Sequence, residues 1–217
     1  MKLVLFDCDG TLVDSAGLIH EVMRRTFLHF GHHEPDLPQT KAIIGLTLDI
    51  AIARMQGKPH ADDEAVAMTG YYKSIFAQVR AEAGFQEPLF PGIAALIADL
   101  AKRDDILIGA VTGKSRRGLS MILETHGFTP HFVVSRTADD CPSKPHPAMV
   151  TECCDQMGMD AADTIVVGDA IYDMMMAKSA GARAVGVSWG YASTAELVTS
   201  GADAIVTNAA DILLHIQ

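Results

Sequence analysis

The sequence is poor in cysteine and in positive charge. It has four cysteines among 217 residues, and none of them forms a CxxC pair, which argues against a disulfide framework and against a cysteine zinc site. We therefore expect reduced, buried thiols. Lysine and arginine total 17 against 27 aspartates and glutamates, a formal net charge of −10. This balance argues against nucleic acid or an anionic membrane as the main partner, although a local cationic pocket could still bind a small anionic substrate.

Long hydrophobic runs, internal repeats and low-complexity segments are lacking as well. The N-terminal apolar run stops at Asp7 after the length of one strand, which is too short for a signal peptide or a membrane span. Hydrophobic content of 49% and charged content of 20% lie close to globular averages. A chain of this length can bury a sizeable core, so we expect a soluble cytoplasmic protein of one large domain or one and a half.

Apolar runs of strand length alternate with helical patterns from residue 90 onward. After an initial strand that ends at Phe6, the expected strands are Leu107–Val111, Phe132–Ser135, Thr164–Val167, Ala184–Val187 and Ala204–Val206. The expected helices are Gly92–Arg103, Lys114–His126, Pro147–Met157, Ile171–Ala180, Thr194–Ser200 and Ala209–His215. This alternation predicts an α/β fold, a Rossmann-like three-layer core around a parallel sheet. Strands so continuously apolar are expected to be buried on both faces.

The stretch from residue 16 to residue 87 has a different pattern. Its apolar residues recur at helical spacing, and no convincing strand interrupts them. We therefore predict an all-helical domain, a cap, inserted between the first strand and the rest of the sheet. The predicted division is residues 1–15 and 88–217 for the α/β core and residues 16–87 for the cap, with short linkers near 15–17 and 86–88.

Residues able to carry chemistry follow the expected strands. In an open parallel sheet, ligands bind at the carboxyl ends of the strands, where the strand order reverses. The residues there are Asp7, Asp9 and Gly10 after the first strand, Thr112 and Gly113 after the second, Lys144 in the loop after the third, and Asp169 and Asp173 after the fourth.

Four carboxylates meet at one edge if the first and fourth strands are neighbours. They cannot all stay ionised unless cations compensate for their charge. Lys144 supplies one charge, and Mg²⁺ suits a site with a few carboxylates, waters and a substrate phosphate. The amide of Gly113 is expected at a helix N-terminus, which binds anions. This arrangement predicts a phosphate held between Mg²⁺, Lys144 and a helix N-terminus, with an aspartate available as a covalent nucleophile.

The same residues carry a family resemblance. DCDGT at 7–11, Thr112, Lys144 and GDAIYD at 168–173 resemble, in order, the four motifs of the haloacid dehalogenase superfamily of phosphohydrolases. The helical insertion resembles the cap that this family places after its first motif. The segments FDCDGTLVDS, TGKSRRGL and SKPHP are most similar to those of the subgroup that contains phosphoglycolate phosphatase and beta-phosphoglucomutase.

The resemblance implies a role for each motif residue. It makes Asp7 the nucleophile and Asp9 the general acid and base, which favours phosphoryl transfer because the dehalogenase branch lacks an acid at the second position. The phosphate would contact Gly10, Thr112, Gly113 and Lys144. The metal set that it implies is Mg²⁺ on Asp7, the carbonyl of Asp9 and Asp169, with Asp173 orienting a metal-bound water or Lys144 instead of binding the ion.

The cap loop around Gly45, Leu46 and Thr47 resembles the family's specificity loop, and it is small and mostly apolar. It favours a phosphatase acting on a small phosphorylated metabolite similar to phosphoglycolate. The alternative is a sugar phosphate mutase similar to beta-phosphoglucomutase, which would need cap cations for a second phosphate; only Lys41 and Arg54 are near. A binding module on a degenerate site is disfavoured because every expected catalytic residue type is present. The oligomeric state is left open.

Overall fold

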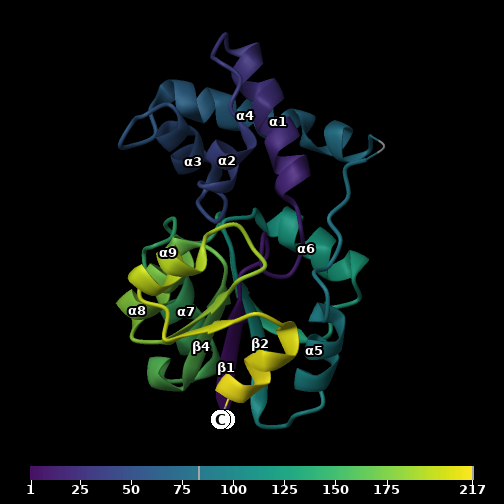
Figure 1. Cartoon of the computed structure of the whole chain (residues 1–217), viewed down its shortest axis with the longest axis vertical. Coiled ribbons are helices and arrows are strands. Elements are labelled where there is room, and N and C mark those ends of the chain that lie inside the picture. Colours follow the sequence, from purple (N-terminus) through teal and green to yellow (C-terminus); the bar gives the residue numbers. More distant parts are fainter. Residues whose placement is uncertain (83, 217) are drawn as a thin grey trace.

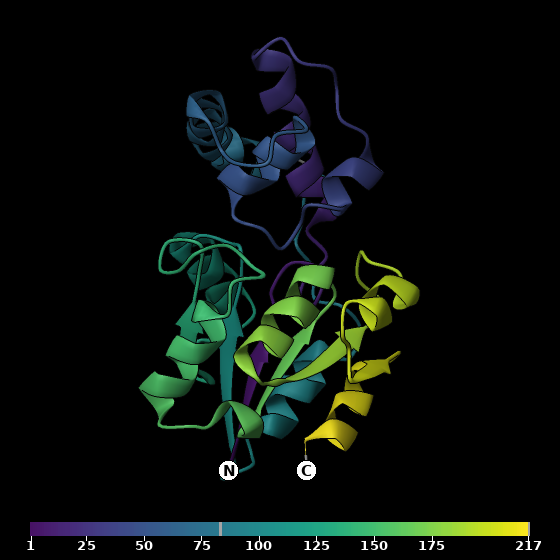
Figure 2. The same cartoon turned by 90° about the vertical axis from the view of Figure 1, so that its left-hand side faces the viewer.

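The computed structural model describes residues 1–82 and 84–216, and its centre is a six-stranded parallel sheet of order β3-β2-β1-β4-β5-β6. Figures 1 and 2 show the strands side by side in the lower part of the molecule. The strands are β1 (Lys2–Phe6), β2 (Ile106–Val111), β3 (Phe132–Arg136), β4 (Thr164–Gly168), β5 (Arg183–Val187) and β6 (Ala204–Val206). The predicted α/β parallel-sheet fold is confirmed.

Helices cover both faces of the sheet. They are α5 (Ile93–Leu100), α6 (Arg116–Thr125), α7 (Ala148–Met157), α8 (Ile171–Ala180) and α9 (Thr194–Thr199), with short 3₁₀ helices η1 (Ala161–Asp163) and η2 (Ala209–His215). Alternate side chains of β1 point to opposite faces: Val4 and Phe6 pack with α5, α6 and η2, whereas Leu3 and Leu5 pack with α7, α8 and α9. The sheet is therefore the middle layer of three.

One expectation for this region was wrong. The strands β3 and β6 are not buried on both faces: Val133 of β3 is 49% exposed, and β6 is half-buried over two of its three residues. Both lie at the edges of the sheet, where helices cover less of each face. The closing helix η2 has its expected bounds and is a 3₁₀ helix, a form that short helices often take.

The segment between β1 and α5 is helical and has a hydrophobic core of its own. Its helices are α1 (Ala16–His29), α2 (Leu37–Lys41), α3 (Leu48–Met55) and α4 (Asp63–Arg80). The core is built from α1, α3 and α4, with Val22, Ile52 and Met68 fully buried in it. In Figure 1 these helices stand above the carboxyl ends of the strands.

The two connections between the sheet layer and these helices run side by side. Val13 forms a bridge with Leu89, and the amide of Asp14 donates to the carbonyl of Pro88 at 2.9 Å. The chain therefore enters and leaves the helical segment at one place. Across residues 1–82 and 84–216, no helix has the length and the apolar character that crossing a membrane requires.

Candidate active site

The strand order reverses at β1, which lies between β2 and β4. The condition set by the sequence, that the first and fourth strands are neighbours, is met: Phe6 pairs with Val167, and the amide of Asp7 donates to the carbonyl of Val167 at 2.9 Å. The ends of β1 and β4 therefore bring Asp7 and Asp169 together at the point where α/β sheets bind ligands.

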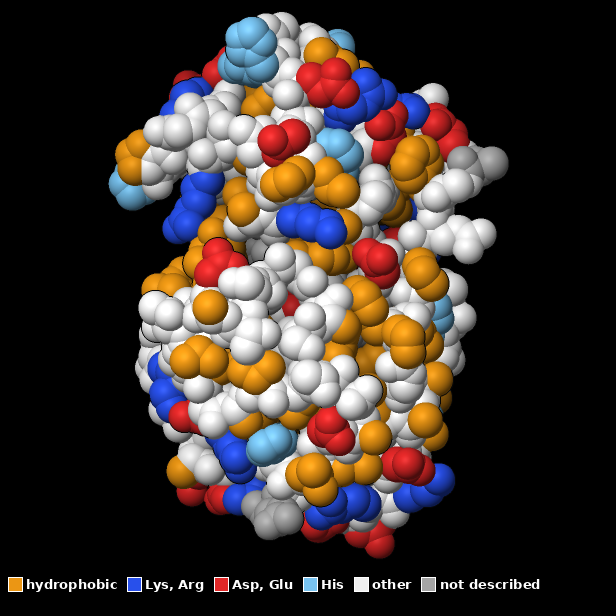
Figure 3. Space-filling view, viewed as in Figure 1, with side chains coloured by type: hydrophobic (Ala, Val, Ile, Leu, Met, Phe, Trp, Pro, Cys, Tyr) orange, Lys and Arg blue, Asp and Glu red, His pale blue; other side chains and the backbone are white. Residues whose placement is uncertain are grey.

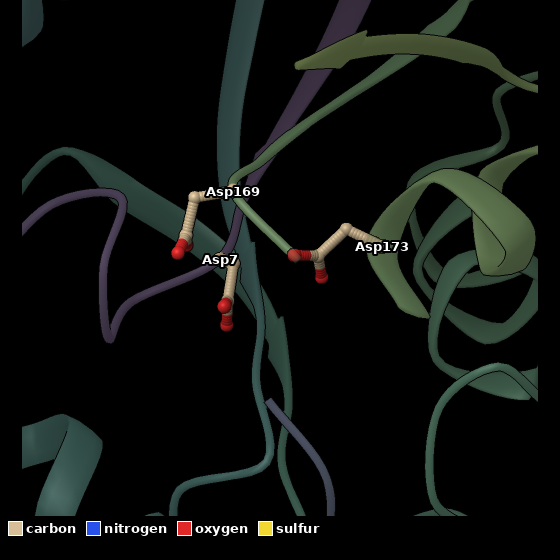
Figure 4. A group of neighbouring side chains, drawn as sticks. All are labelled: Asp7, Asp169 and Asp173. Carbon is tan, nitrogen blue, oxygen red and sulfur yellow. The ribbon is translucent and has the colours of Figure 1, made fainter. Parts of the chain in front are cut away.

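Three of the predicted carboxylates form a buried cluster. One carboxylate oxygen each of Asp7, Asp169 and Asp173 lies within 4.8 Å of the others, and none of the three residues is more than 1% exposed. Figure 4 shows Asp7 and Asp169 following the strand ends, with Asp173 reaching toward them from α8. Like charges this close need cations nearby.

Lys144 is the cation that the protein itself supplies. Its Nζ lies 2.8 Å from Asp7 Oδ1 and 2.6 Å from Asp173 Oδ1, and the side chain is fully buried. Burial alone would lower the pKa of Lys144, but Asp173 and Asp7 outweigh burial and raise that pKa. Lys144 is therefore held as a cation and balances one of the three carboxylates.

Lys144 alone does not balance the charge of three carboxylates. Burial is the largest influence on the pKa of Asp7 and raises it to about 7, against the lowering effect of Lys144. Burial also holds the pKa of Asp169 well above its usual range, and Asp7 and Asp173 add to the effect. A divalent cation would balance the two carboxylates that the lysine does not.

The oxygen atoms of the cluster fit such an ion. Asp7 Oδ2 is buried and has no hydrogen-bond partner within the described part of the chain. Asp173 faces Lys144: its Oδ1 accepts from the Lys144 ammonium, and its Oδ2 accepts from the Ala170 amide at 3.0 Å. Carboxylate oxygens are the ligands that Mg²⁺ prefers, so Asp7 and Asp169 would hold it while Asp173 positions Lys144.

Asp169 is held by a loop that the sequence did not indicate. Its Oδ1 accepts from the Thr11 hydroxyl at 2.8 Å, and its Oδ2 accepts from the Tyr191 amide at 2.9 Å. A Cβ on Gly10 or on Gly190 would lie 2.2 and 2.1 Å from atoms of the Asp169 side chain. Both glycines are therefore needed for the backbone to approach this carboxylate. Residue 190 follows β5, so it lies at the carboxyl ends of the strands like the other site residues. This position is the signal by which the sequence could have indicated the loop.

Asp9 belongs to a second buried group of charges. Its Oδ1 accepts from the Ser15 hydroxyl and lies 2.6 Å from Lys114 Nζ. The same Nζ lies 3.1 Å from Glu87 Oε1, and Arg80 Nε donates to Glu87 Oε2 at 2.8 Å. The sequence singled out neither Lys114 nor Glu87 as a site side chain. Glu87 is in the linker that leads back from the helical segment, so this group connects Asp9 to the linker.

Thr112 and Gly113 lie at the end of β2, as predicted, but the helix that follows starts later. Ser115 caps α6 by accepting from the Gly118 amide, so the helix begins at Arg116 and not at Lys114. The Thr112 hydroxyl is buried and accepts from the Lys114 amide at 3.2 Å. The expectation that Gly113 opens the helix was therefore wrong, because its amide lies in the loop before the cap.

The loop Gly45–Leu46–Thr47 contacts this edge of the sheet. A Cβ on Gly113 would lie 2.4 Å from the Leu46 carbonyl oxygen, so only glycine admits the loop there. Gly45 has a φ of +103°, a conformation that favours glycine. The Thr47 amide donates to Ser143 Oγ at 2.9 Å, one residue before Lys144. The structure therefore brings all three predicted loop residues against the site.

A cavity of about 590 Å³ lies between the helical segment and the sheet layer. Asp9, Gly113, Lys114 and the loop at 45–47 line it, whereas Asp7, Lys144 and Asp169 do not. Figure 3 shows a notch between the two parts and hydrophobic side chains along their boundary. The cavity therefore borders Asp9 but not the carboxylate cluster.

The two cap cations that the sequence singled out do not line this cavity. The Lys41 ammonium lies 5.4 Å from the Tyr191 ring centre, and the Arg54 guanidinium lies 5.2 Å from the Tyr172 ring centre. Arg54 also donates to the Tyr172 hydroxyl at 3.1 Å. Both side chains therefore connect the helical segment to aromatic rings that follow β4 and β5.

Comparison with known proteins agrees with this geometry. The sequence pattern described as haloacid dehalogenase-like hydrolase matches residues 4–187. A probable phosphatase, IndB, of Dickeya dadantii is 32% identical over 97% of this chain and 91% of that protein. A phosphoglycolate phosphatase of Yersinia pestis is 31% identical over 97% of this chain and 90% of that protein.

The fold comparison covers the whole molecule. The crystal structure of a protein described as a predicted phosphoglycolate phosphatase from Haemophilus somnus superposes with a TM-score of 0.83 at 25% identity, covering 100% of this chain and 98% of that one. The matched residues include the aspartate cluster, Lys144 and the inserted helices. The chain therefore belongs to the haloacid dehalogenase-like hydrolases, as its motifs indicated.

Proposed function

We propose that this protein is a Mg²⁺-dependent phosphatase that hydrolyses a phosphate monoester of a small metabolite through a phosphoenzyme on Asp7. The observation that carries the proposal is the buried Asp7 carboxylate, which has Lys144 on one oxygen and no hydrogen-bond partner on the other within the described chain. Residues 16–87 are proposed to form a cap over this site. The proposed location is the cytoplasm, since all four cysteines are free, buried thiols.

The first proposed step transfers the phosphoryl group to the protein. A carboxylate oxygen of Asp7 attacks phosphorus, and the bond between phosphorus and the alcohol oxygen breaks. Asp9, as the carboxylic acid, gives its proton to that oxygen, so the neutral alcohol leaves. Lys144 stays protonated beside Asp7 and offsets negative charge on the transferring group.

The second proposed step returns Asp7 to its starting state. Asp9, now a carboxylate, takes a proton from water, and the water oxygen attacks phosphorus. The bond between phosphorus and Asp7 breaks, and inorganic phosphate leaves. Asp9 therefore has opposite protonation states in the two steps, and Ser15 and Lys114 are the partners of its carboxylate form.

Mg²⁺ would be held by Asp7 and Asp169, with the backbone carbonyl of Asp9 as the ligand that the family resemblance adds. When bound, the ion neutralises charge on the phosphate and on Asp7. Thr11 and the Tyr191 amide hold Asp169 in place, and Asp173 holds Lys144. Such supporting contacts orient ligands and keep their geometry fixed.

Relatives named phosphoglycolate phosphatase make phosphoglycolate the first substrate to test. A mutase would need cap cations to grip a second phosphate. Lys41 and Arg54 lie over tyrosine rings outside the cavity, which favours the phosphatase.

The proposal is tested by measuring phosphate release from a panel of phosphorylated metabolites with Mg²⁺. Asp7→Asn should lower kcat by at least about a thousandfold, because covalent transfer requires the carboxylate. Asp104→Asn, an exposed aspartate just before β2 and therefore at the opposite end of that strand from Thr112, is the matched control and should keep full activity. Excess EDTA should abolish release, and added Mg²⁺ should restore it.

Full activity of Asp7→Asn, with the unfolding midpoint unchanged, contradicts the nucleophile assignment. Turnover that survives EDTA removes the metal from the proposal. If no compound releases phosphate but a sugar phosphate isomerises when a bisphosphate primer is present, the mutase replaces the phosphatase.

A further inference from the structure

The cavity beside Asp9 lies on the side of the site where the alcohol part of a substrate must be. This step rests on the proposed function. Asp9 is proposed to protonate the leaving oxygen, so it must contact the oxygen that joins phosphorus to the alcohol. Asp9 lines the cavity, whereas Asp7 and Lys144 do not. The alcohol therefore extends past Asp9 into the cavity, and the phosphate stays at the strand ends.

The cavity is large for a two-carbon alcohol. Its volume of about 590 Å³ is within the range of pockets that bury ligands with tens of atoms, roughly 300–1,000 Å³. Glycolate would leave most of this space to water. The loop at 45–47 already lies against Gly113, so the volume remains with the loop in contact with the sheet layer.

The walls are mainly apolar and come from four different elements. They include Met23 of α1, Ile44 and Leu46 before α3, Phe76 of α4 and Met121 of α6. Such walls stabilise an apolar body by removing its surface from water. Methionine side chains also adapt to irregular shapes, so the cavity suits a bulky group.

The charged residues around the cavity give no excess of positive charge. Acidic side chains are contributed by Asp9, Asp49, Glu87 and Asp139, and basic ones by Lys73, Lys114 and Arg117. Lys114 is already paired with Asp9 and Glu87, and Lys73 and Arg117 are exposed to solvent. This lining does not favour a second anionic group, such as the carboxylate of glycolate or a second phosphate.

We infer that the preferred substrate is the phosphate monoester of an alcohol with a bulky, largely apolar body, which occupies the cavity between α1, α4 and α6. The phosphate and the alcohol are then recognised by different parts of the chain. The strand ends recognise the phosphate, and the cap residues recognise the alcohol.

The test compares three substrates: phosphoglycolate, ethyl phosphate and 2-phenylethyl phosphate. In each of them the ester oxygen is bonded to a CH₂ group, so the substrates differ mainly in the body of the alcohol. We expect kcat/KM for 2-phenylethyl phosphate to exceed the values for both others by at least about tenfold, since a single methylene in an apolar pocket is often worth that much.

A variant tests whether the cavity is the cause. Ala77 lines the cavity from α4 and is exposed, so Ala77→Phe fills space without disturbing the buried core. It should lower the ratio of kcat/KM for 2-phenylethyl phosphate over ethyl phosphate by about tenfold. Ala67→Phe, on the same helix and also exposed but not lining the cavity, should leave this ratio unchanged.

The outcomes separate this inference from the proposed function. If phosphate is released in an Asp7-dependent manner but phosphoglycolate is the best substrate, the phosphatase stands and the inference is overturned. An unchanged substrate ratio in Ala77→Phe also overturns it. If no substrate releases phosphate, the proposed function and this inference both fail.

Discussion

Asp9 lies at one end of a line of buried ion pairs that runs through Lys114 and Glu87 to Arg80 of α4. Burial alone would lower the pKa of Lys114, but Asp9 and Glu87 outweigh burial and raise that pKa. Lys114 therefore remains a cation between two carboxylates. It restricts the orientation of Asp9, which the proposed transfer of protons in both directions requires.

Lys114→Met should lower kcat for an alkyl phosphate by about ten- to a hundredfold with less change in KM, because Asp9 then lacks a fixed orientation. Steady-state kinetics on an alkyl phosphate checks this. The double variant Lys114→Met/Glu87→Gln should recover part of the stability that Lys114→Met loses, since it removes one of the two buried carboxylates that Lys114 balances. Lys102→Met, at an exposed ion pair with Asp99, is the control. An unchanged kcat in Lys114→Met would show that Asp9 does not depend on Lys114.

Sequence spacing was sufficient to predict where the residues that directly follow the strands lie. Asp7, Thr112 and Asp169 lie at the strand ends because the direction of a parallel strand fixes where its last residue lies. The contact of the Lys114 side chain with Asp9 and that of Tyr191 with Asp169 could not be found in this way. A lysine side chain is long and flexible, and Tyr191 acts through its backbone amide, so neither contact leaves a signal in the spacing.

At the scale of the element, α1 is tied to the end of the helical segment by charged pairs. Glu21 accepts hydrogen bonds from Arg24 and Arg25, which are three and four residues later on the same helix. Both terminal nitrogens of Arg25 also donate hydrogen bonds to the Glu82 carboxylate, at 2.8 and 2.7 Å. Hydrogen bonds from Arg24 and then Arg25 lower the pKa of Glu21 to about 2 despite partial burial.

Glu21→Gln should lower the free energy of unfolding at pH 7 by about 1 kcal/mol, a value reduced for solvent screening. The folded pKa is depressed below the ordinary value of 4.5, so this contribution is fully present above about pH 4.5 and is lost as the pH falls through about 2. Urea unfolding at several pH values should show the variant and the wild type converging in acid. Glu124→Gln, on an exposed site of α6, is the control, and a pH-independent difference would contradict the assignment.

Element identity was predictable because strands and helices have different hydrophobic periods. The last strand and α8 were predicted with their observed bounds, Ala204–Val206 and Ile171–Ala180. The start of α6 was not, because the Ser115 cap outweighed the helical pattern before it. Edge exposure of β3 was missed, since strand order follows from the packing of the whole sheet and not from one apolar run.

At the scale of the molecule, the helical segment contacts the sheet layer through two cation–aromatic pairs and the loop at 45–47. Arg54 lies over Tyr172 and donates to its hydroxyl, and Lys41 lies over Tyr191. Tyr191 also receives hydrogen bonds from the amides of Ser15 and Ala16, at the first linker. These contacts hold the two parts in the arrangement that encloses the cavity.

Arg54→Met should weaken the contact between the helical segment and the sheet layer by about 1 kcal/mol, the sum expected for an exposed cation–π pair and a hydrogen bond. This corresponds to a roughly fivefold larger population in which the two parts are separated. Proteolysis of the linker around residues 86–88 should accelerate by that factor, while the unfolding midpoint changes little. Arg103→Met, at an exposed pair with Asp105, is the control. Equal cleavage rates in the two variants would show that Arg54 does not hold the arrangement.

The cavity is the part of the site that the sequence could least predict. Its walls come from α1, α4, α6 and the loop before α3, and their distances depend on how the helical segment lies on the sheet layer. Apolar residues such as Phe76 and Met121 fit a buried helix face equally well in the sequence. Only their relation to Asp9 in three dimensions distinguishes a substrate wall from ordinary packing.

The adjacent linkers have a consequence for how such a protein can diversify. Val13 pairs with Leu89, and the Asp14 amide donates to the Pro88 carbonyl. The two ends of the helical insert therefore lie side by side where they join the α/β layer. Another insert whose ends lie equally close together could replace them without changing the path of any strand. Under the proposed function, the residues that bind phosphate and those that select its alcohol can therefore be exchanged separately, and a library of helical segments grafted between residues 15 and 88 would test this separation.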